Sequence, residues 1–208
     1  MQIFVTGTDT DVGKTIISSW LCLHTGYSYF KPIQTGSILG TDSHQVSNLT
    51  NANIYKENFV YKEPLSPHLA VSLEINIDKI SLPKTRSLIV EGAGGVLVPI
   101  NKTMLMVDLI KKLAIPTILV ARSTLGTINH TLLSLEALRA RNIPILGVIL
   151  NGLPSQDNLE AIEFYGRVQV LASVPKLQQI NREHLMQTPL SNRLKAIFGL
   201  NNDEFKRA

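Results

Sequence analysis

The chain of 208 residues has a single cysteine, Cys22, which excludes both a disulfide framework and a zinc site built from several cysteines. It also lacks any run approaching the ~20 apolar residues that a membrane-spanning helix needs. The first residues, Met1 to Gly7, carry no basic leader followed by a long apolar segment. We therefore expect a cytoplasmic protein with no membrane partner.

The chain also lacks a strong excess of charge of either sign. It has 20 Lys and Arg residues and 16 Asp and Glu residues, and no block of like charges accounts for the net charge of +4. Such a mild balance gives no reason to expect a nucleic-acid partner. The hydrophobic fraction of 44% is enough for a soluble protein with a substantial core, and the length fits one domain spanning residues 1–208.

Short apolar runs alternate with segments of helical spacing, an order typical of an α/β protein with a parallel sheet covered by helices on both faces. The expected strands are Gln2 to Thr6, Tyr27 to Lys31, Ser87 to Glu91, Pro116 to Ala121, Ile145 to Leu150 and Val168 to Val174. The expected helices are Gly13 to His24, Met104 to Leu113, Thr127 to Ala140, Gln156 to Tyr165 and Leu190 to Phe198. We expect residues 38–85 to form an irregular insertion and 201–208 a flexible tail.

The strongest motif runs from Gly7 to Thr15 and lies between the first strand and the first helix. Its glycines let backbone N–H groups face an anion, Lys14 supplies a charge to the outer phosphates, and the Thr15 hydroxyl can ligate Mg²⁺. Five residues, not the usual four, separate Gly7 from Gly13. The motif predicts a P-loop of the nucleoside triphosphatase type.

A second motif places Glu91 after an apolar strand and before Gly92, Ala93 and Gly94. Ligands of open α/β sheets gather at the carboxyl ends of strands, and a carboxylate there suits Mg²⁺. The alternative is a solvated acid before a flexible turn. Lys31 ends the second strand and would reach the same edge, unless it is an ordinary surface lysine. Asp42 has a turn or a helix cap as its competing interpretation.

Two later segments are less specific. Gly126, Thr127, Ile128 and Asn129 open a helix, where free N–H groups favour an anion such as a carboxylate, although plain capping explains them equally well. Asn151 follows a strand and precedes Gly152. Its amide offers the donor and acceptor that an adenine edge requires, but an Asn-Gly pair alone indicates only a turn.

Taken together, these residues resemble the ATP-dependent dethiobiotin synthetase family. The resemblance spans residues 1 to about 177 and rests on the motifs Thr6 to Thr15, Lys31 to Gly36, Pro64 to His68, Glu91 to Gly95 and Leu125 to His130. It implies a carboligase that joins CO₂ to 7,8-diaminononanoate (7,8-diaminopelargonate) through a carbamic-phosphoric anhydride. ATP is cleaved to ADP and phosphate, and the product is a cyclic urea.

The resemblance also implies residue roles. Lys14 and Lys31 would be catalytic, and the Mg²⁺ ligands would be Thr15, Asp42 and Glu91. The nucleotide would contact Asp11, Val12, Gly13, Lys14, Thr15, Ile16, Asp42, Glu91, Gly92, Ala93, Gly94, Asn151, Gly152, Val174, Pro175 and Lys176. The substrate would contact Thr10, Thr35, Gly126, Thr127, Ile128 and Asn129, the last four from the second chain of a homodimer.

Two departures from the family pattern and two competing classes remain. The segment 73–86 is short for a crossover helix. Residues 176–179 differ from the Trp and acidic residues common in the family, so the preference for ATP is less secure than the phosphate site.

An amide-forming synthetase related to the cobyrinate amidases would need a glutamine-hydrolysing domain, for which 208 residues leave no room. A partition-type ATPase would often carry an extra lysine near the start of the loop, and residues 8–11 have none.

Overall fold

The computed structural model describes residues 1–70 and 74–200. Its centre is a parallel sheet of seven strands in the order β4-β2-β6-β1-β7-β8-β9. The strands are β1 (Gln2–Gly7), β2 (Ser28–Phe30), β4 (Ile54–Tyr55), β6 (Leu88–Gly95), β7 (Thr117–Arg122), β8 (Ile145–Asn151) and β9 (Val170–Val174). A separate pair, β3 (Ile33–Gln34) and β5 (Phe59–Val60), is also parallel.

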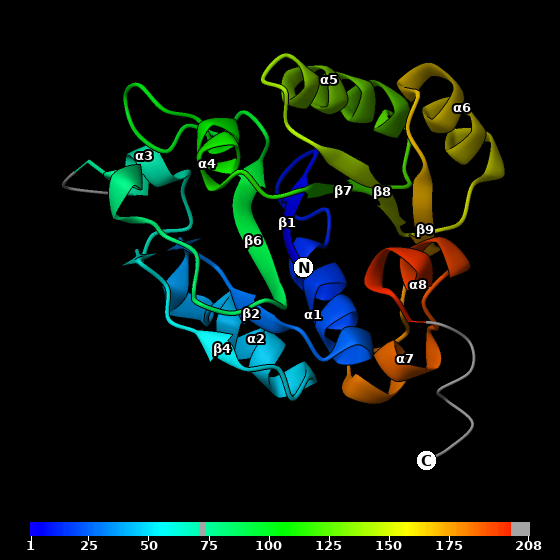
Figure 1. Cartoon of the computed structure of the whole chain (residues 1–208), viewed down its shortest axis with the longest axis horizontal. Helices are drawn as coiled ribbons and strands as arrows, with labels where there is room; N and C mark the ends of the chain where they lie inside the picture. Colours follow the sequence, from blue (N-terminus) through cyan, green and yellow to red (C-terminus); the bar gives the residue numbers. More distant parts are fainter. Residues whose placement is uncertain (71–73, 201–208) are drawn as a thin grey trace.

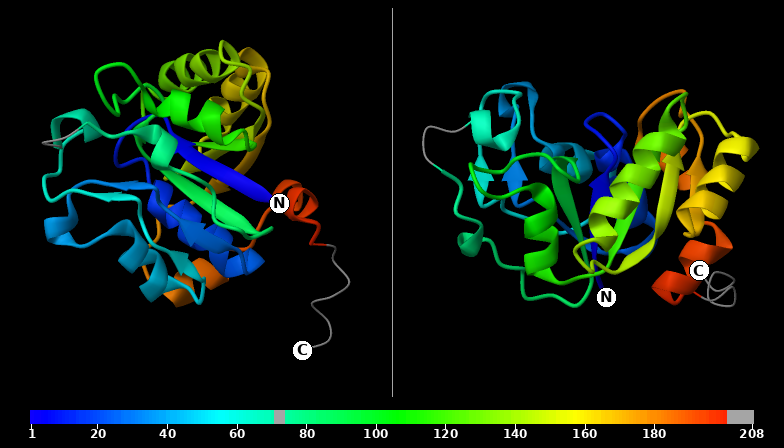
Figure 2. Two further views of the ribbon diagram at one scale, coloured as in Figure 1. Left: turned by 60° about the vertical axis from the view of Figure 1, so that its left-hand side comes forward. Right: turned by 90° about the horizontal axis from the view of Figure 1, so that it is seen from above.

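Helices cover both faces of this sheet (Figures 1 and 2). One face carries α4 (Met106–Leu113), α5 (Thr127–Arg139) and α6 (Gln156–Gly166). The other carries α1 (Lys14–Thr25), α2 (Asp42–Leu49), α7 (Arg182–Gln187) and α8 (Asn192–Phe198). The short α3 (Pro67–Ala70) and the 3₁₀ turns Ser37–Leu39 and Ile77–Lys79 lie in the connections between β3 and β6.

Each face has its own hydrophobic core, because successive residues of a strand point to opposite sides. Phe4 and Val90 pack with Leu109 and Leu135 beneath α4 and α5. Ile3, Ile89 and Ile149 join the second core, under α1, α2, α7 and α8. Strands buried on both sides explain the nearly continuous apolar runs in the sequence.

The strand order places the end of β2, the middle of β6 and the end of β1 side by side, since β6 lies between the other two. Lys31 directly follows β2, and Glu91 lies within β6 opposite Val5 of β1. The loop that follows β1 leads directly into Lys14 at the start of α1. Three segments distant in sequence therefore meet at one edge of the sheet.

The predicted α/β class, all six expected strands and all five expected helices are confirmed, with ends shifted by at most four residues. Glu91 is not the last residue of its strand, which continues to Gly95. The expectation of an irregular insertion over 38–85 requires correction. This segment contains α2 and supplies β4, the edge strand next to β2. The expected tail, 201–208, lies outside the described residues.

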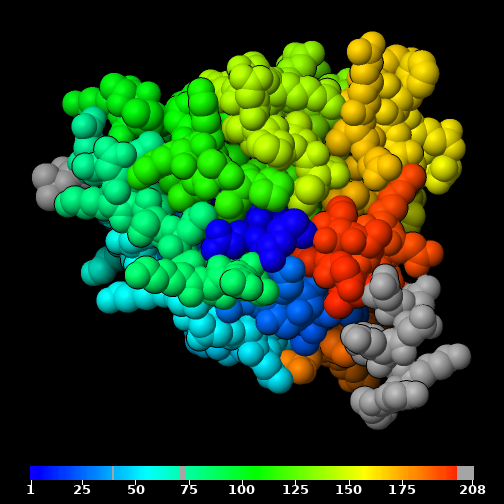
Figure 3. All heavy atoms as spheres, viewed as in Figure 1, coloured from blue at the N-terminus to red at the C-terminus, as the bar shows by residue number. Residues whose placement is uncertain are grey.

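Residues 74–86 contain one 3₁₀ turn and no longer helix, in agreement with the short crossover that the sequence indicates. Side chains from outside the segment hold its middle and its carboxyl end. Gln2 donates to the backbone oxygen of Thr85 at 2.7 Å, and Lys112 donates to that of Ile80 at 3.2 Å. Figure 3 shows the start of β1, in blue, at the surface between this segment and α8. Among the helices described, none has the length and apolar character needed to cross a membrane.

Candidate active site at the phosphate loop

The loop between β1 and α1 is shaped by backbone conformations that favour glycine. Gly13 has φ +91°, and a Cβ there would lie 2.0 Å from Nδ2 of Asn151. Asn151 in turn donates to the backbone oxygen of Val12 at 3.0 Å, so the end of β8 holds the loop. The Lys14 ammonium donates to the backbone oxygen of Asp9 at 2.9 Å. The loop thus curls over the amino end of α1, where free N–H groups suit an anion.

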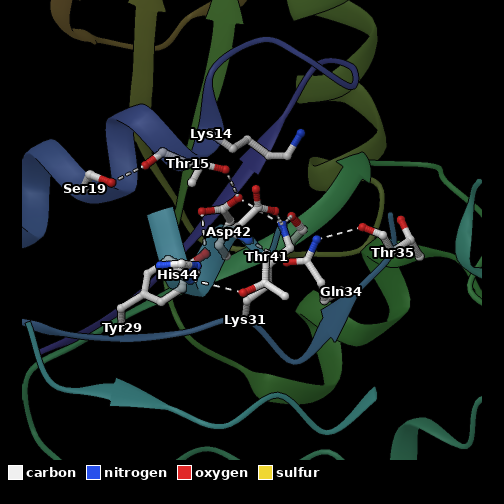
Figure 4. A network of polar contacts seen from close by, with 12 residues as sticks. Lys14, Thr15, Ser19, Tyr29, Lys31, Gln34, Thr35, Thr41, Asp42 and His44 are labelled. Atoms are coloured by element: carbon white, nitrogen blue, oxygen red, sulfur yellow. Dashed lines mark hydrogen bonds and ion pairs between the residues drawn. The ribbon is translucent and has the colours of Figure 1, made fainter. Parts of the chain in front are cut away.

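A cluster of opposite charges lies beside this loop. The Lys31 ammonium is 2.5 Å from Oδ2 of Asp42 and 3.0 Å from Oε1 of Glu91. Thr15 donates to the same Glu91 oxygen at 2.8 Å. Figure 4 shows Thr15, Lys31 and Asp42 directed toward one point, with the Lys14 ammonium turned away. Lys31 is 4% exposed and Glu91 0%, so neither is the solvated surface residue that the competing interpretation required.

Asp42 is positioned by the start of α2. It is the first residue of the helix, and the preceding Thr41 accepts a hydrogen bond from the backbone N–H of His44 as the N-cap. Gln34 is buried and accepts from the backbone N–H of Asp42 at 2.9 Å, which ties β3 to the helix start. The capping function belongs to Thr41, and the Asp42 carboxylate is left for Lys31.

The charges of the cluster shift its pKa values in opposite directions. Burial, reinforced by the nearby positive charge of Lys31, lowers the pKa of Lys14 from 10.5 to about 8. Burial also disfavours the charged form of Lys31, but Glu91 and Asp42 outweigh it and raise the pKa of Lys31. For Asp42, burial acts upward, but Lys31 outweighs it and the pKa is lowered. Lys31 and Asp42 are therefore charged at neutral pH, and Lys14 loses its charge as the pH rises through about 8.

This gives a pH dependence for nucleotide binding. Phosphate groups bound at the predicted loop would favour the charged form of Lys14, so above pH 8 the free protein would take up a proton as it binds a nucleotide. We expect the affinity for metal-free ATP to fall by up to about tenfold per pH unit above pH 8. Calorimetric titration between pH 7 and 9.5 measures it. Lys14→Arg, which stays charged throughout, should flatten the profile, and an unchanged slope in that variant would contradict the assignment.

A cavity of about 760 Å³ opens over this cluster. Of the residues predicted from the sequence, it is lined by Thr10, Asp11, Gly13, Lys14, Thr15, Ile16, Lys31, Thr35, Asp42, Glu91, Ala93 and Gly94. The sequence reasoning did not assign several others to the site, namely Gln34, Gly36, Gly40, Gln45, Val98, Ile180 and the stretch from Pro64 to Pro67. Gln34, Gly36 and Pro64 to Pro67 lie within the motifs Lys31 to Gly36 and Pro64 to His68 that carry the resemblance, so the sequence does contain a signal for them.

The remaining predicted residues do not line this cavity. Val12 is buried in the core beneath α1, and Gly92 packs against Phe4, where a Cβ would come within 2.9 Å of the ring. Asn151, Gly152 and Val174 lie together at the ends of β8 and β9, with the Gly152 N–H donating to the Val174 oxygen at 2.9 Å. Gly126 to Asn129 open α5, and Pro175 and Lys176 follow β9.

The residues present fit a magnesium ion. Residues 1–70 and 74–200 contain no group of three or more His, Cys, Asp or Glu side chains suited to hold a metal. The Thr15 hydroxyl and the Asp42 and Glu91 carboxylates would instead supply hard oxygen ligands, as Mg²⁺ prefers when phosphates provide the rest. The Lys31 ammonium contacts both carboxylates, so the two acidic side chains already lie around one positive charge.

The parallel sheet and the glycine-bearing loop that leads into Lys14 and Thr15 at the start of α1 define a P-loop nucleoside triphosphatase fold. Comparison with solved structures agrees. A plasmid partition protein from Borrelia burgdorferi bound to AMPPNP matches with a TM-score of 0.52 at 13% identity, covering 96% of both chains. A ParA family ATPase from Chlorobium tepidum has a TM-score of 0.50 at 12% identity, covering 93% and 92%. Likeness at this level shows the fold alone.

Sequence comparison is more specific. A family model described as an AAA domain matches residues 1–184. The ATP-dependent dethiobiotin synthetase of Lawsonia intracellularis is 57% identical over 95% of this chain and 99% of that protein. The enzyme of the same name from Paramagnetospirillum magneticum is 49% identical over 90% and 94%. The chain belongs to the ATP-dependent dethiobiotin synthetase family, which confirms the resemblance read from its motifs.

Proposed function

We propose that this chain catalyses the ATP-dependent formation of dethiobiotin from 7,8-diaminononanoate and CO₂, with release of ADP and phosphate. The observation that carries the proposal is the convergence of Lys14, Lys31, Asp42 and Glu91 on one cavity beside the P-loop. Relatives that align over nearly the full chain bear the name of this activity, which supports the assignment.

The reaction has three steps. One amine nitrogen of the substrate attacks CO₂ and loses a proton, which gives a carbamate. A carbamate oxygen then attacks the γ-phosphorus of ATP, the bond to the β-phosphate oxygen breaks, and ADP leaves. The second amine attacks the carbamoyl carbon, phosphate leaves and a proton is lost, which closes the cyclic urea. Such transfers need aligned reactants and neutralised charge more than a covalent nucleophile.

The residues of the cavity meet this demand. Lys14 binds the outer phosphates, and Lys31 stabilises the charge that develops between the carbamate and the γ-phosphoryl group. When bound through Thr15, Asp42 and Glu91, Mg²⁺ supplies further charge neutralisation at the phosphate oxygens. Thr10 and Thr35, which also line the cavity, would hydrogen-bond the carbamate end of the substrate. We assign the adenine to Asn151, Gly152 and the stretch from Val174 to Lys176.

The test of this function is a coupled phosphate assay with ATP, Mg²⁺ and bicarbonate. We expect phosphate release only when the diamine is added, because the γ-phosphoryl group has no acceptor until the carbamate has formed. Dethiobiotin should appear in a one-to-one ratio with phosphate. Strong hydrolysis that is indifferent to the diamine, without cyclic-urea product, would contradict the proposal and favour a nucleotide switch.

We further propose that the active form is a homodimer. The start of α5, from Gly126 to Asn129, does not line the cavity of its own chain, and the N–H groups of Ile128 and Asn129 suit the tail carboxylate of a substrate bound to a second chain. We expect light scattering of the active protein to give a mass near twice the 23.0 kDa of one chain. A fully active species at the mass of one chain would contradict a shared site.

A further inference from the structure

Tyr29 carries a polar hydroxyl group although its position in the apolar core requires only an apolar side chain. It is the middle residue of β2, is 0% exposed, and its ring belongs to the core beneath α1. Phenylalanine would fill the same volume without bringing a hydroxyl group out of water. A buried hydroxyl is costly unless it is hydrogen-bonded, so its partner indicates why it is there.

That partner is the candidate metal ligand Glu91. The Tyr29 hydroxyl donates to Oε2 of Glu91 at 2.9 Å. The other carboxylate oxygen, Oε1, receives the hydrogen bonds of Thr15 and Lys31 at 2.8 and 3.0 Å. The register of β2 and β6, in which Tyr29 pairs with Ile89, brings the phenol within reach of the carboxylate two residues further along. One oxygen of Glu91 is thus held from the core side, and the other is presented to Thr15 and Lys31.

The three donors to Glu91 are not equivalent once ligands bind. Thr15 and Lys31 line the cavity and are assigned to the metal and the reacting groups, whereas Tyr29 does not line it. Tyr29 is buried in the core, so groups that enter the cavity do not compete for its hydrogen bond to Glu91. Tyr29 can therefore hold the carboxylate in the same orientation before and after the nucleotide arrives.

We propose that Tyr29 is a positioning residue for the divalent cation: its hydroxyl holds one oxygen of Glu91 so that the other is presented to the metal. The inference rests on the proposed magnesium site and extends it to a residue outside the cavity. Groups that orient metal ligands commonly contribute 10–100-fold to metal affinity.

The test is Tyr29→Phe, with Tyr27→Phe as the matched control. Tyr27 undergoes the same chemical change two residues earlier, where its ring packs on Phe198. The quantity measured is the dissociation constant of Mn²⁺ from protein saturated with a non-hydrolysable ATP analogue, followed by the electron paramagnetic resonance signal of free Mn²⁺. We expect a 10–100-fold increase for Tyr29→Phe and none for Tyr27→Phe.

A second readout separates positioning from packing. In turnover assays Tyr29→Phe should raise the Mg²⁺ concentration needed for half-maximal rate, while kcat at saturating Mg²⁺ stays close to that of the unaltered protein. An unchanged Mn²⁺ dissociation constant would overturn the inference. A variant that does not fold, or one that loses metal-free nucleotide binding to the same degree, would also overturn it, because the hydroxyl would then serve the fold.

The Mn²⁺ measurement needs no diamine, so it can fail independently of the proposed function. If the unaltered protein makes no dethiobiotin but binds Mn²⁺ in a Tyr29-dependent way, the function fails and the positioning role stands. If it makes dethiobiotin and Tyr29→Phe binds Mn²⁺ normally, the function stands and the inference fails. If the unaltered protein binds no Mn²⁺ in the presence of the nucleotide analogue, both the inference and the proposed magnesium site are overturned.

Discussion

Replacing Lys31 with alanine is expected to lower kcat by roughly 10²–10³-fold, the usual effect of removing one group that stabilises transition-state charge. The ammonium lies between two carboxylates in the cavity beside the phosphate loop, where the proposed mechanism places the charge that develops as the γ-phosphoryl group is transferred. The affinity for ATP should change far less, because the proposed mechanism assigns phosphate binding to the loop and to Lys14. Steady-state kinetics and calorimetric titration of ATP measure the two quantities separately.

Lys111→Ala is the matched control, since Lys111 is an exposed lysine on α4 away from the cavity. It should leave both quantities unchanged. A Lys31→Ala variant that loses ATP affinity in proportion to its turnover would make Lys31 part of the nucleotide cradle. A variant that keeps full turnover would remove Lys31 from the chemistry altogether.

The phosphate loop could be predicted from the sequence because its determinants are contiguous. The glycines, Lys14 and Thr15 lie between one strand and one helix, and local chemistry is sufficient to identify them. The contact between Lys31 and Glu91 is not visible in the same way. Lys31 follows one apolar strand and Glu91 lies within another, and the sequence does not show which strands are neighbours in the sheet. Their contact depends on β6 lying between β1 and β2, an order that is visible only in the folded chain.

Tyr29 could not be found in this way. In a strand that reads Ser28-Tyr29-Phe30, an aromatic residue indicates core packing, and its ring does pack in the core. Only the register of β2 against β6 brings its hydroxyl to Glu91. A polar group with a distant partner leaves no periodic signal along the chain.

The helix and the strand within residues 38–85 could not be predicted from the sequence for a different reason. In α2 only Ser43, Val46 and Leu49 are buried, so its apolar pattern is too sparse to indicate a helix. The edge strand β4 is two residues long, too short for an alternating pattern to be recognised. Proline and scattered polar residues then dominate the local signal, although this segment completes the sheet and supplies Asp42.

Gly13→Ala, which adds only a Cβ methyl group, should reduce activity more than the same change at any other glycine of the loop. The new Cβ would lie 2.0 Å from the Asn151 amide, and φ of +91° is unfavourable for any residue with a side chain. The loop or the end of β8 must therefore shift, and displacing a catalytic array by about 1 Å can cost roughly 100-fold in rate. We expect kcat/KM to fall by at least about that factor, together with a loss of ATP affinity measured by calorimetry.

The control lies at the other end of the same helix. Gly26 follows α1, has φ +70°, and a Cβ there would meet nothing within 4 Å. Gly26→Ala carries the same backbone strain, about 1–2 kcal/mol of unfolding free energy, without touching the site. It should lower the thermal midpoint and leave ATP affinity intact. If Gly13→Ala loses only a similar stability and binds ATP normally, the contact between Asn151 and the loop does not shape the phosphate site.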